Sequence, residues 1–239
     1  TKCVYNGPFA MTNLVEDNSM TWVKNDQYWD KDNVKLNQVN WYCVAENATA
    51  ATMFDNGQLD VFDAAGDYIA KYDKEVEAGN MQTMTTEYPG TMVLCYEQSE
   101  GGKSGLMKNV NIRKAISYSI NREEMVSAVY GRYTAAYGFV SPAITLDGTS
   151  YRKQASETMK EEYEQYAGDA DKLKALFQKG LDELGITDKP EDITITLLSQ
   201  GSATENQLER EYLQQSISQN LGVKVELNTV GDYQMFANE

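Results

Sequence analysis

Short runs with apolar residues, divided by turn residues, make up the beginning of the chain. The runs 9–15 and 19–24 are separated by Glu16-Asp17-Asn18, which is typical of a β-hairpin. The run 39–44 is rich in aromatic and β-branched residues and predicts a further strand. Three more apolar runs also predict strands, at 59–62, 81–88 and 91–96.

Helical spacing of apolar residues recurs along the chain. The first helices are predicted at 48–54, before Asn56-Gly57, and at 67–78, before Gly79. A pair of helices follows near 112–131, and Asn121 three residues before Glu124 gives the second one a capping pattern.

The end of the chain repeats strand and helix in turn. A strongly amphipathic helix is predicted at 171–184, then a strand at 193–198, a helix at 204–220 and a strand at 223–227. This β-α-β order predicts two parallel strands joined by a right-handed crossover. The fold class is therefore α/β with mixed sheets.

Composition narrows the function. The chain has 239 residues and a net charge of −15, which favours solubility and argues against binding to nucleic acid or an anionic membrane. Histidine is absent, which excludes Ser-His-Asp and Cys-His catalysis and histidine metal sites. Neither GxGxxG nor a P-loop is present, so no cofactor is predicted. The 36 acidic residues leave carboxylate chemistry open, although none forms a catalytic motif.

Cys3, Cys43 and Cys95 lie far apart without a CxxC pair, and we expect three small buried side chains rather than a redox or zinc site. No transmembrane run, signal peptide or lipobox is found. Because the chain starts at Thr1 without Met, we expect it to come from a longer precursor.

The 16 tyrosines are the unusual feature of the composition. Most are expected to be half-buried structural residues, although tyrosine also suits recognition of varied ligands. Ligand sites in α/β proteins favour strand ends and the crevice between lobes. That points to Asp63 and Ala64 and to the chain crossing from Tyr88 to Thr91. Asp63 fits either a ligand amine or a solvated charge beside a helix.

The order of several motifs resembles the extracellular solute-binding proteins, family 5, which include peptide-binding components of ABC importers. The most specific stretch is Lys24 to Asp30, similar to the family's "KNPDYW" motif but with Asp26 in place of proline. Four further stretches match in order: 6–9 ("GTGPY"), 50–61 ("aLksGeiDi"), 110–122 ("DvRvRqALsyAiDRe") and 130–142 ("vy.G...pa.g.vpP").

The resemblance implies a fragment of a two-lobe clamp of the periplasmic-binding-protein II type, with residues 1–88 in lobe I and 89–239 forming the first portion of lobe II. It implies a monomeric, non-enzymatic protein outside the membrane, lipid-anchored through a segment not in this chain, whose partners are a peptide and ABC permease subunits. It also implies ligand-binding roles for a set of residues in the cleft: Asp63, Ala64, Tyr88, Thr91, Met92, Tyr130 and Tyr137.

Three alternatives stay open. Another solute of the same family, such as a sugar or a metal complex, is possible, although the lack of histidine disfavours a histidine-held metal. A surface scaffold that reuses the fold is the second alternative. A carboxylate-based hydrolase is the third, and it requires two acids at a defined separation.

Overall fold

The computed structural model describes residues 3–155, 158–201 and 204–231. It divides into two compact units, Thr1–Tyr68 and Ile69–Glu239. The helix α2 (Asp67–Glu77) begins in the first unit and continues in the second. The lobe division at residues 88 and 89 concerns a larger protein and stays a prediction.

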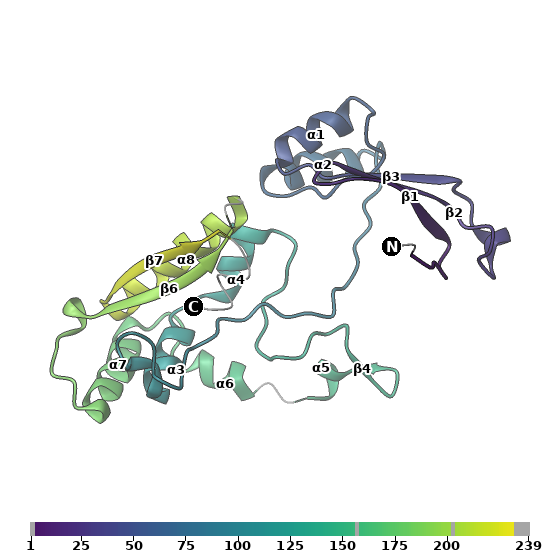
Figure 1. Cartoon of the computed structure of the whole chain (residues 1–239). Coiled ribbons are helices and arrows are strands. Elements are labelled where there is room, and N and C mark those ends of the chain that lie inside the picture. The colour runs from purple at the N-terminus through teal and green to yellow at the C-terminus, as the bar shows by residue number, and fades with distance from the viewer. Residues whose placement is uncertain (1–2, 156–157, 202–203, 232–239) are drawn as a thin grey trace. The chain divides into compact units, whose positions relative to one another are not determined.

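The first unit is built on a three-stranded antiparallel sheet with β2 in the middle (Figure 1). Its strands are β1 (Phe9–Val15), β2 (Ser19–Lys24) and β3 (Gln38–Tyr42), with the short 3-10 turn η1 (Lys31–Asn33) before β3. Asp17 turns the chain between β1 and β2 at φ 55°, a left-handed conformation that aspartate tolerates better than most side chains. The predicted hairpin is confirmed.

The helix α1 (Asn47–Asp55) ends as the following Asn-Gly pair predicts. The Gly57 N–H donates to the carbonyl of Phe54 at 2.9 Å, and the Gln58 N–H donates to the carbonyl of Met53 at 2.8 Å. These two bonds form a Schellman motif, which satisfies carbonyls that the helix leaves without a partner. Gly57 has φ +71°, where a side chain would cause strain.

The second unit contains most of the helices. Its elements after α2 are η2 (Leu106–Lys108), α3 (Val110–Tyr118), α4 (Arg122–Met125), η3 (Val126–Tyr130), β4 (Thr145–Leu146), β5 (Thr149–Ser150), α5 (Tyr151–Gln154), α6 (Thr158–Glu164), α7 (Ala170–Leu184), η4 (Pro190–Asp192), β6 (Thr194–Gln200), α8 (Thr204–Leu221) and β7 (Lys224–Val230). The predicted helix pair near 112–131 is therefore α3 followed by α4, and α4 continues as the π-helical turn η3.

The strands β6 and β7 pair in parallel, from Thr194 opposite Lys224 to Gln200 opposite Val230. The helix α8 connects them and packs against both strands (Figure 1). A parallel pair requires such a crossover, since no tight turn can reverse the chain twice. The predicted β-α-β unit is confirmed.

The helices α3 and α7 form the centre of the core. Phe177 and Leu181 of α7 and Ile112 of α3 have no exposed surface, and each such side chain stabilises the fold by about 1.5–3 kcal/mol. The two helices approach closely because Gly180 has no side chain. A Cβ atom there would lie 2.5 Å from Cγ1 of Ile112.

A polar contact joins α8 to the end of α3. The hydroxyl of Ser216 donates to the carbonyl of Ser119 at 2.8 Å, and the amide of Asn220 donates to the same carbonyl at 2.9 Å. This carbonyl lies just beyond the last turn of α3, where helices leave acceptors without partners. The polar side of α8 therefore has a structural role inside the unit.

Three predicted strands are wrong. Within the described residues, none of 59–62, 81–88 and 91–96 belongs to a sheet. Apolar runs there do favour an extended chain, but a strand also needs a neighbour to receive its hydrogen bonds. The described part of the chain supplies no such neighbour for these runs.

The expectation of buried cysteines is also wrong, because all three thiols are exposed. Cys95 shows the reason. Its neighbours Leu94 and Tyr96 pack against the core, and successive side chains of an extended chain point in opposite directions. Cys3 and Cys43 lie outside the strands and helices of the first unit.

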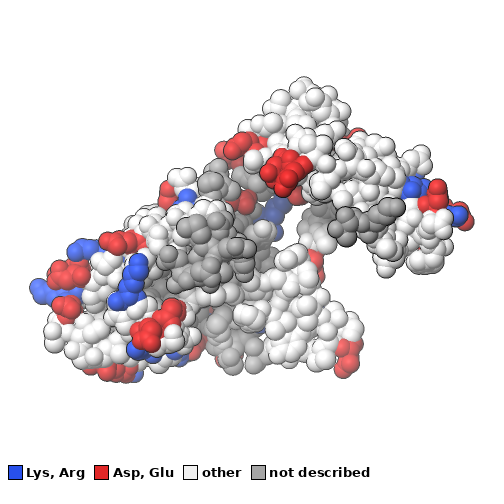
Figure 2. Space-filling view, in the orientation of Figure 1, with Lys and Arg blue, Asp and Glu red and all other residues white. Residues whose placement is uncertain are grey.

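The charges on the surface are mixed in sign. Figure 2 shows lysine and arginine beside aspartate and glutamate over the part of the second unit that carries α7 and α8. Such interspersed charge is typical of a solvated face. Among the described residues, no helix combines the length and apolarity that a membrane crossing requires.

Candidate functional site

The seven predicted site residues divide between the two units. Asp63 and Ala64 belong to the first unit and the other five to the second. In the first unit, the Asn47 side chain donates to the main-chain carbonyl of Asp63 at 3.0 Å and accepts from the N–H of Ala65 at 3.5 Å. This contact fixes the loop through its backbone, and it leaves Asp63 exposed to solvent.

The segment 81–96 of the second unit is mostly exposed. The hydroxyl of Ser141 donates to the carbonyl of Tyr88 at 2.9 Å. Among the described residues, no other hydrogen bond reaches the backbone of 81–96. Tyr88 is 82% exposed and Met92 is 60% exposed, whereas Thr91 is half-buried. The segment therefore presents free main-chain donors and acceptors on both sides of Tyr88.

Besides the bond from Ser141, packing at one end holds this segment on the unit, and a contact within the segment shapes its middle. At its far end, Leu94 and Tyr96 pack against the core of the unit. In its middle, the ring of Tyr88 folds over Gly90, where a Cβ atom would come within 2.5 Å of the ring. The segment is thus anchored on the unit without being part of a sheet.

Tyr130 lies at the end of η3 and stacks on Tyr133, with ring centroids 4.8 Å apart. Its hydroxyl is buried and has no hydrogen-bond partner in the described part of the chain. Burial raises the pKa of this hydroxyl above its usual range, and the nearby carboxylate of Glu209 adds to the effect because it repels a phenolate. Tyr130 therefore stays neutral and can donate a hydrogen bond.

Tyr137 is buried inside the second unit. Its hydroxyl donates to the Glu123 carboxylate, at 2.5 Å from Oε1 and 2.6 Å from Oε2. Its ring lies 5.4 Å from the guanidinium of Arg122 and 5.2 Å from the ring centroid of Tyr163. Burial and the Glu123 carboxylate both raise the pKa of Tyr137. In this arrangement Tyr137 holds the unit together, and its hydroxyl is not open to a ligand.

The structure adds two residues that sequence reasoning did not single out. Ser141 lies in the matched stretch 130–142, and its hydroxyl links this stretch to the crossing segment. Arg122 ends the matched stretch 110–122. Its guanidinium donates to the hydroxyl of Ser117 at 2.9 Å and faces two tyrosine rings. Both residues belong to the matched motifs, but the spacing of residues in the sequence does not indicate which side chains or carbonyls they contact.

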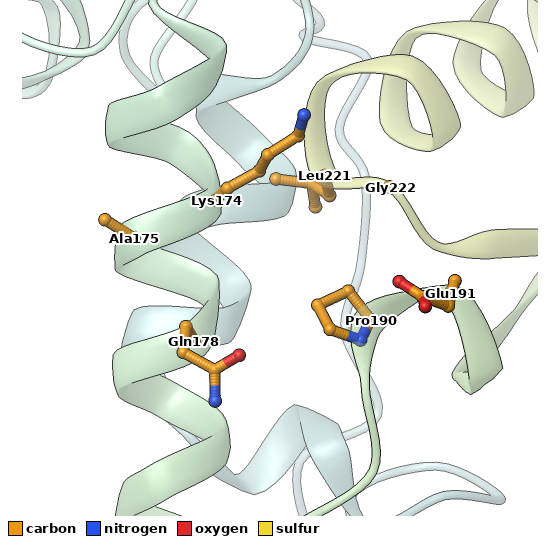
Figure 3. A pocket seen from close by; sticks show the side chains of 7 residues that line it. All are labelled: Lys174, Ala175, Gln178, Pro190, Glu191, Leu221 and Gly222. Carbon is orange, nitrogen blue, oxygen red and sulfur yellow. The ribbon is translucent and has the colours of Figure 1, made fainter.

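A hollow in the second unit lies away from these residues. It has a volume of about 410 Å³ and opens between α7, η4 and the end of α8 (Figure 3), where it is lined by Lys174, Ala175, Gln178, Pro190, Glu191, Leu221 and Gly222. None of the predicted site residues lines it. Among the described residues, no group of three potential metal ligands is present.

The sequence of this chain matches a known family of proteins. The sequence profile of the "Bacterial extracellular solute-binding proteins, family 5 Middle" matches residues 1–239. The chain belongs to this family of solute-binding proteins.

Individual relatives agree with the family assignment. The chain is 31% identical to the dipeptide-binding protein DppE of Bacillus subtilis over 94% of its own length, and 32% identical to the oligopeptide-binding protein OppA of the same species, also over 94%. It spans 38% and 39% of those two proteins. It is therefore similar to well under half of each of them.

The structure of OppA from Listeria monocytogenes bound to peptide matches 98% of this chain with a TM-score of 0.73 and 27% sequence identity. The chain covers 44% of that protein. The predicted fold class, part of a periplasmic-binding-protein fold with mixed helices and sheets, is confirmed by this match.

Proposed function

We propose that this family 5 chain is part of the substrate-binding component of an ABC importer that captures oligopeptides outside the membrane and delivers them to a permease. The observation that carries the proposal is the similarity, over nearly the whole chain, to proteins named for dipeptide and oligopeptide binding. In this role the protein breaks no bond and is not an enzyme.

The geometry of the segment 81–96 supports peptide as the ligand. An extended peptide can add to a chain whose main-chain groups are free, so that backbone hydrogen bonds supply affinity for many sequences. Tyr88, Thr91 and Met92 would contact the ligand in this way. Asp63, Ala64 and Tyr130 would line the cleft of the complete protein, and Tyr137 would support it from behind.

The complete protein would close its two lobes around the peptide, with residues 1–88 in lobe I and 89–239 in lobe II. Closure excludes water and orders both lobes around the ligand. We further propose that the protein acts as a monomer, held at the outer face of the membrane by a lipid anchor outside these 239 residues. The 239-residue chain alone is expected to bind peptides weakly, because it spans well under half of its relatives.

Thermal unfolding of the complete protein with a peptide library tests this proposal. A peptide at 100 times its Kd is expected to stabilise the native state by about 2.7 kcal/mol, which raises the Tm. A library without effect, together with a Tm rise caused by a sugar or a metal complex, would show that the ligand class is wrong.

A substitution at the crossing segment makes the test specific to the site. Ser141→Ala removes the hydroxyl that donates to Tyr88, and we expect it to weaken peptide binding about fivefold, as the loss of one hydrogen bond of ~1 kcal/mol implies. Ser104→Ala is the matched control, because Ser104 is exposed and lies outside the segment. Equal affinities of the two variants would show that the Tyr88 contact does not position the ligand.

A further inference from the structure

The sequence contains two Asn-Gly pairs, Asn6-Gly7 and Asn56-Gly57, and both lie in the first unit. Such pairs are prone to deamidation because glycine has no side chain to hinder attack by its own nitrogen on the preceding asparagine. We propose that Asn6 is a site of spontaneous deamidation in the folded chain, whereas Asn56 is protected by the end of its helix.

The reaction requires only water. The main-chain nitrogen of Gly7 attacks Cγ of Asn6, a bond forms between them, and the bond from Cγ to Nδ2 breaks. Ammonia leaves and takes up the proton that the Gly7 nitrogen loses. Water then opens the resulting succinimide ring at one of its two carbonyls, which gives aspartate or isoaspartate. Either product carries a carboxylate, which is ionised at neutral pH.

The C-terminal cap of α1 opposes this reaction at Asn56. The attacking nitrogen would be that of Gly57, whose N–H donates to the carbonyl of Phe54 at 2.9 Å. The Asn56 N–H itself donates to the carbonyl of Thr52 at 3.1 Å. The Gly57 nitrogen can turn toward the Asn56 side chain only after these bonds break. Reaction at Asn56 therefore requires a local opening of the helix end.

The attacking nitrogen beside Asn6 has no such restraint. Its side chain is exposed, and among the described residues neither its amide nor the N–H of Gly7 has a hydrogen-bond partner. A Cβ atom built on Gly7 meets no atom within 4 Å. The five-membered ring therefore has room to form without displacing a neighbour.

The modification would loosen the start of the sheet. The Asn25 amide donates to the carbonyl of Gly7 at 2.9 Å and to that of Tyr5 at 3.4 Å, so that it bridges the chain on both sides of Asn6. Isoaspartate inserts one more carbon into the main chain between these two carbonyls. Asn25 can then no longer reach both, and the chain before β1 loses one of its ties to the loop after β2.

Peptide mapping by mass spectrometry tests the proposal. The 239-residue chain is incubated at pH 8 and 37 °C, once native and once in urea, and the acid products at residues 6 and 56 are followed over time. In the native chain we expect residue 6 to react at least about tenfold faster, because residue 56 reacts only from an opened state. In urea the two rates are expected to become similar.

Two results would overturn the proposal. One is equal rates at the two residues in the native chain. The other is an absence of product at residue 6 in the native chain over a time in which the urea sample reacts. Gly7→Ala serves as the chemical control, because the open space around Gly7 accommodates the methyl group while the methyl hinders attack. An unchanged rate at residue 6 in this variant would exclude the succinimide route.

Discussion

The close contact of α3 and α7 at Gly180 makes a quantitative prediction. Gly180→Ala places a Cβ atom 2.5 Å from Cγ1 of Ile112 and 2.9 Å from Oδ1 of Asn109. Real Cβ atoms do not come so close to their neighbours, so α7 or the Ile112 side chain must shift. Overpacking of this kind costs about 1–3 kcal/mol.

Two further effects on stability, one unfavourable and one favourable, act at the same position. The Asn109 oxygen accepts the N–H groups of Asn111 and Ile112 and thereby caps α3, so displacing it costs up to ~1 kcal/mol. In the opposite direction, alanine is favoured over glycine inside a helix by about 0.8–1.0 kcal/mol. The steric terms are larger, and we expect a net destabilisation of about 1–2 kcal/mol.

Urea denaturation followed by circular dichroism measures this loss in the free energy of unfolding. In thermal unfolding, the Tm should fall by about 2–8 °C. Lys179→Ala is the matched control on the same helix, since Lys179 is exposed and should change stability by less than ~0.5 kcal/mol. In an Ile112→Ala background, which removes Cγ1, Gly180→Ala should cost less than in the parent chain. A Gly180→Ala variant as stable as the parent would refute the reasoning, because helix propensity would then outweigh the contact.

Two further predictions concern the same unit. Hydrogen bonds from the hydroxyl of Ser99 and from the N–H groups of Gly102 and Glu100 lower the pKa of Glu97 to about 2. The order that Glu97 gives its loop is therefore present above about pH 4.5 and lost as the pH falls toward 2. The protection of the Gly102 amide against hydrogen exchange, relative to its intrinsic exchange rate at each pH, should fall over that range, but not in Glu97→Gln. Ser216→Ala and Asn220→Ala each leave the Ser119 carbonyl with one donor, and each should lower the free energy of unfolding, measured by urea denaturation, by ~1 kcal/mol. The double variant leaves this carbonyl without either donor and should lower the free energy of unfolding by more than the sum of the two single variants. Strict additivity would show that the two donors do not share this acceptor.

Much of the fold was predictable because local pattern and tertiary contact agree. The runs 9–15 and 19–24 lie on either side of a three-residue turn and pair with each other, so the boundaries of β1 and β2 are as predicted. The amphipathic run that became α7 buries the same face that its spacing indicates, including Phe177 and Leu181. Where a segment finds its partner nearby, sequence pattern suffices.

The helix α8 shows where pattern gives less information. Its inward side carries polar groups that serve as donors to distant carbonyls, such as the hydroxyl of Tyr212, which donates to the carbonyl of Asn121 at 3.1 Å. A polar residue facing inward is indistinguishable in sequence from one facing solvent. The helix was predictable from propensity and its place between two strands, whereas its contacts were not.

The candidate site was predictable only in outline. The motifs indicated the crossing segment, but the contact of Ser141 with Tyr88 joins residues 53 positions apart and needed the structure. Tyr137 is the clearest case. Its place in a matched motif implies a ligand contact, whereas its hydroxyl is engaged by Glu123. A side chain can stand in a site motif and still be buried behind the surface that a ligand would contact.

The bond between Asn220 and the Ser119 carbonyl has a consequence for the order in which the chain folds. It joins residues 101 positions apart, so the α3 end of the core stays incomplete until Asn220 has been synthesised. The three strands of the first unit lie within Phe9–Tyr42 and find their partners early. Since contacts of long sequence separation form slowly, we expect the first unit to become resistant to protease well before the second during synthesis from the N-terminus.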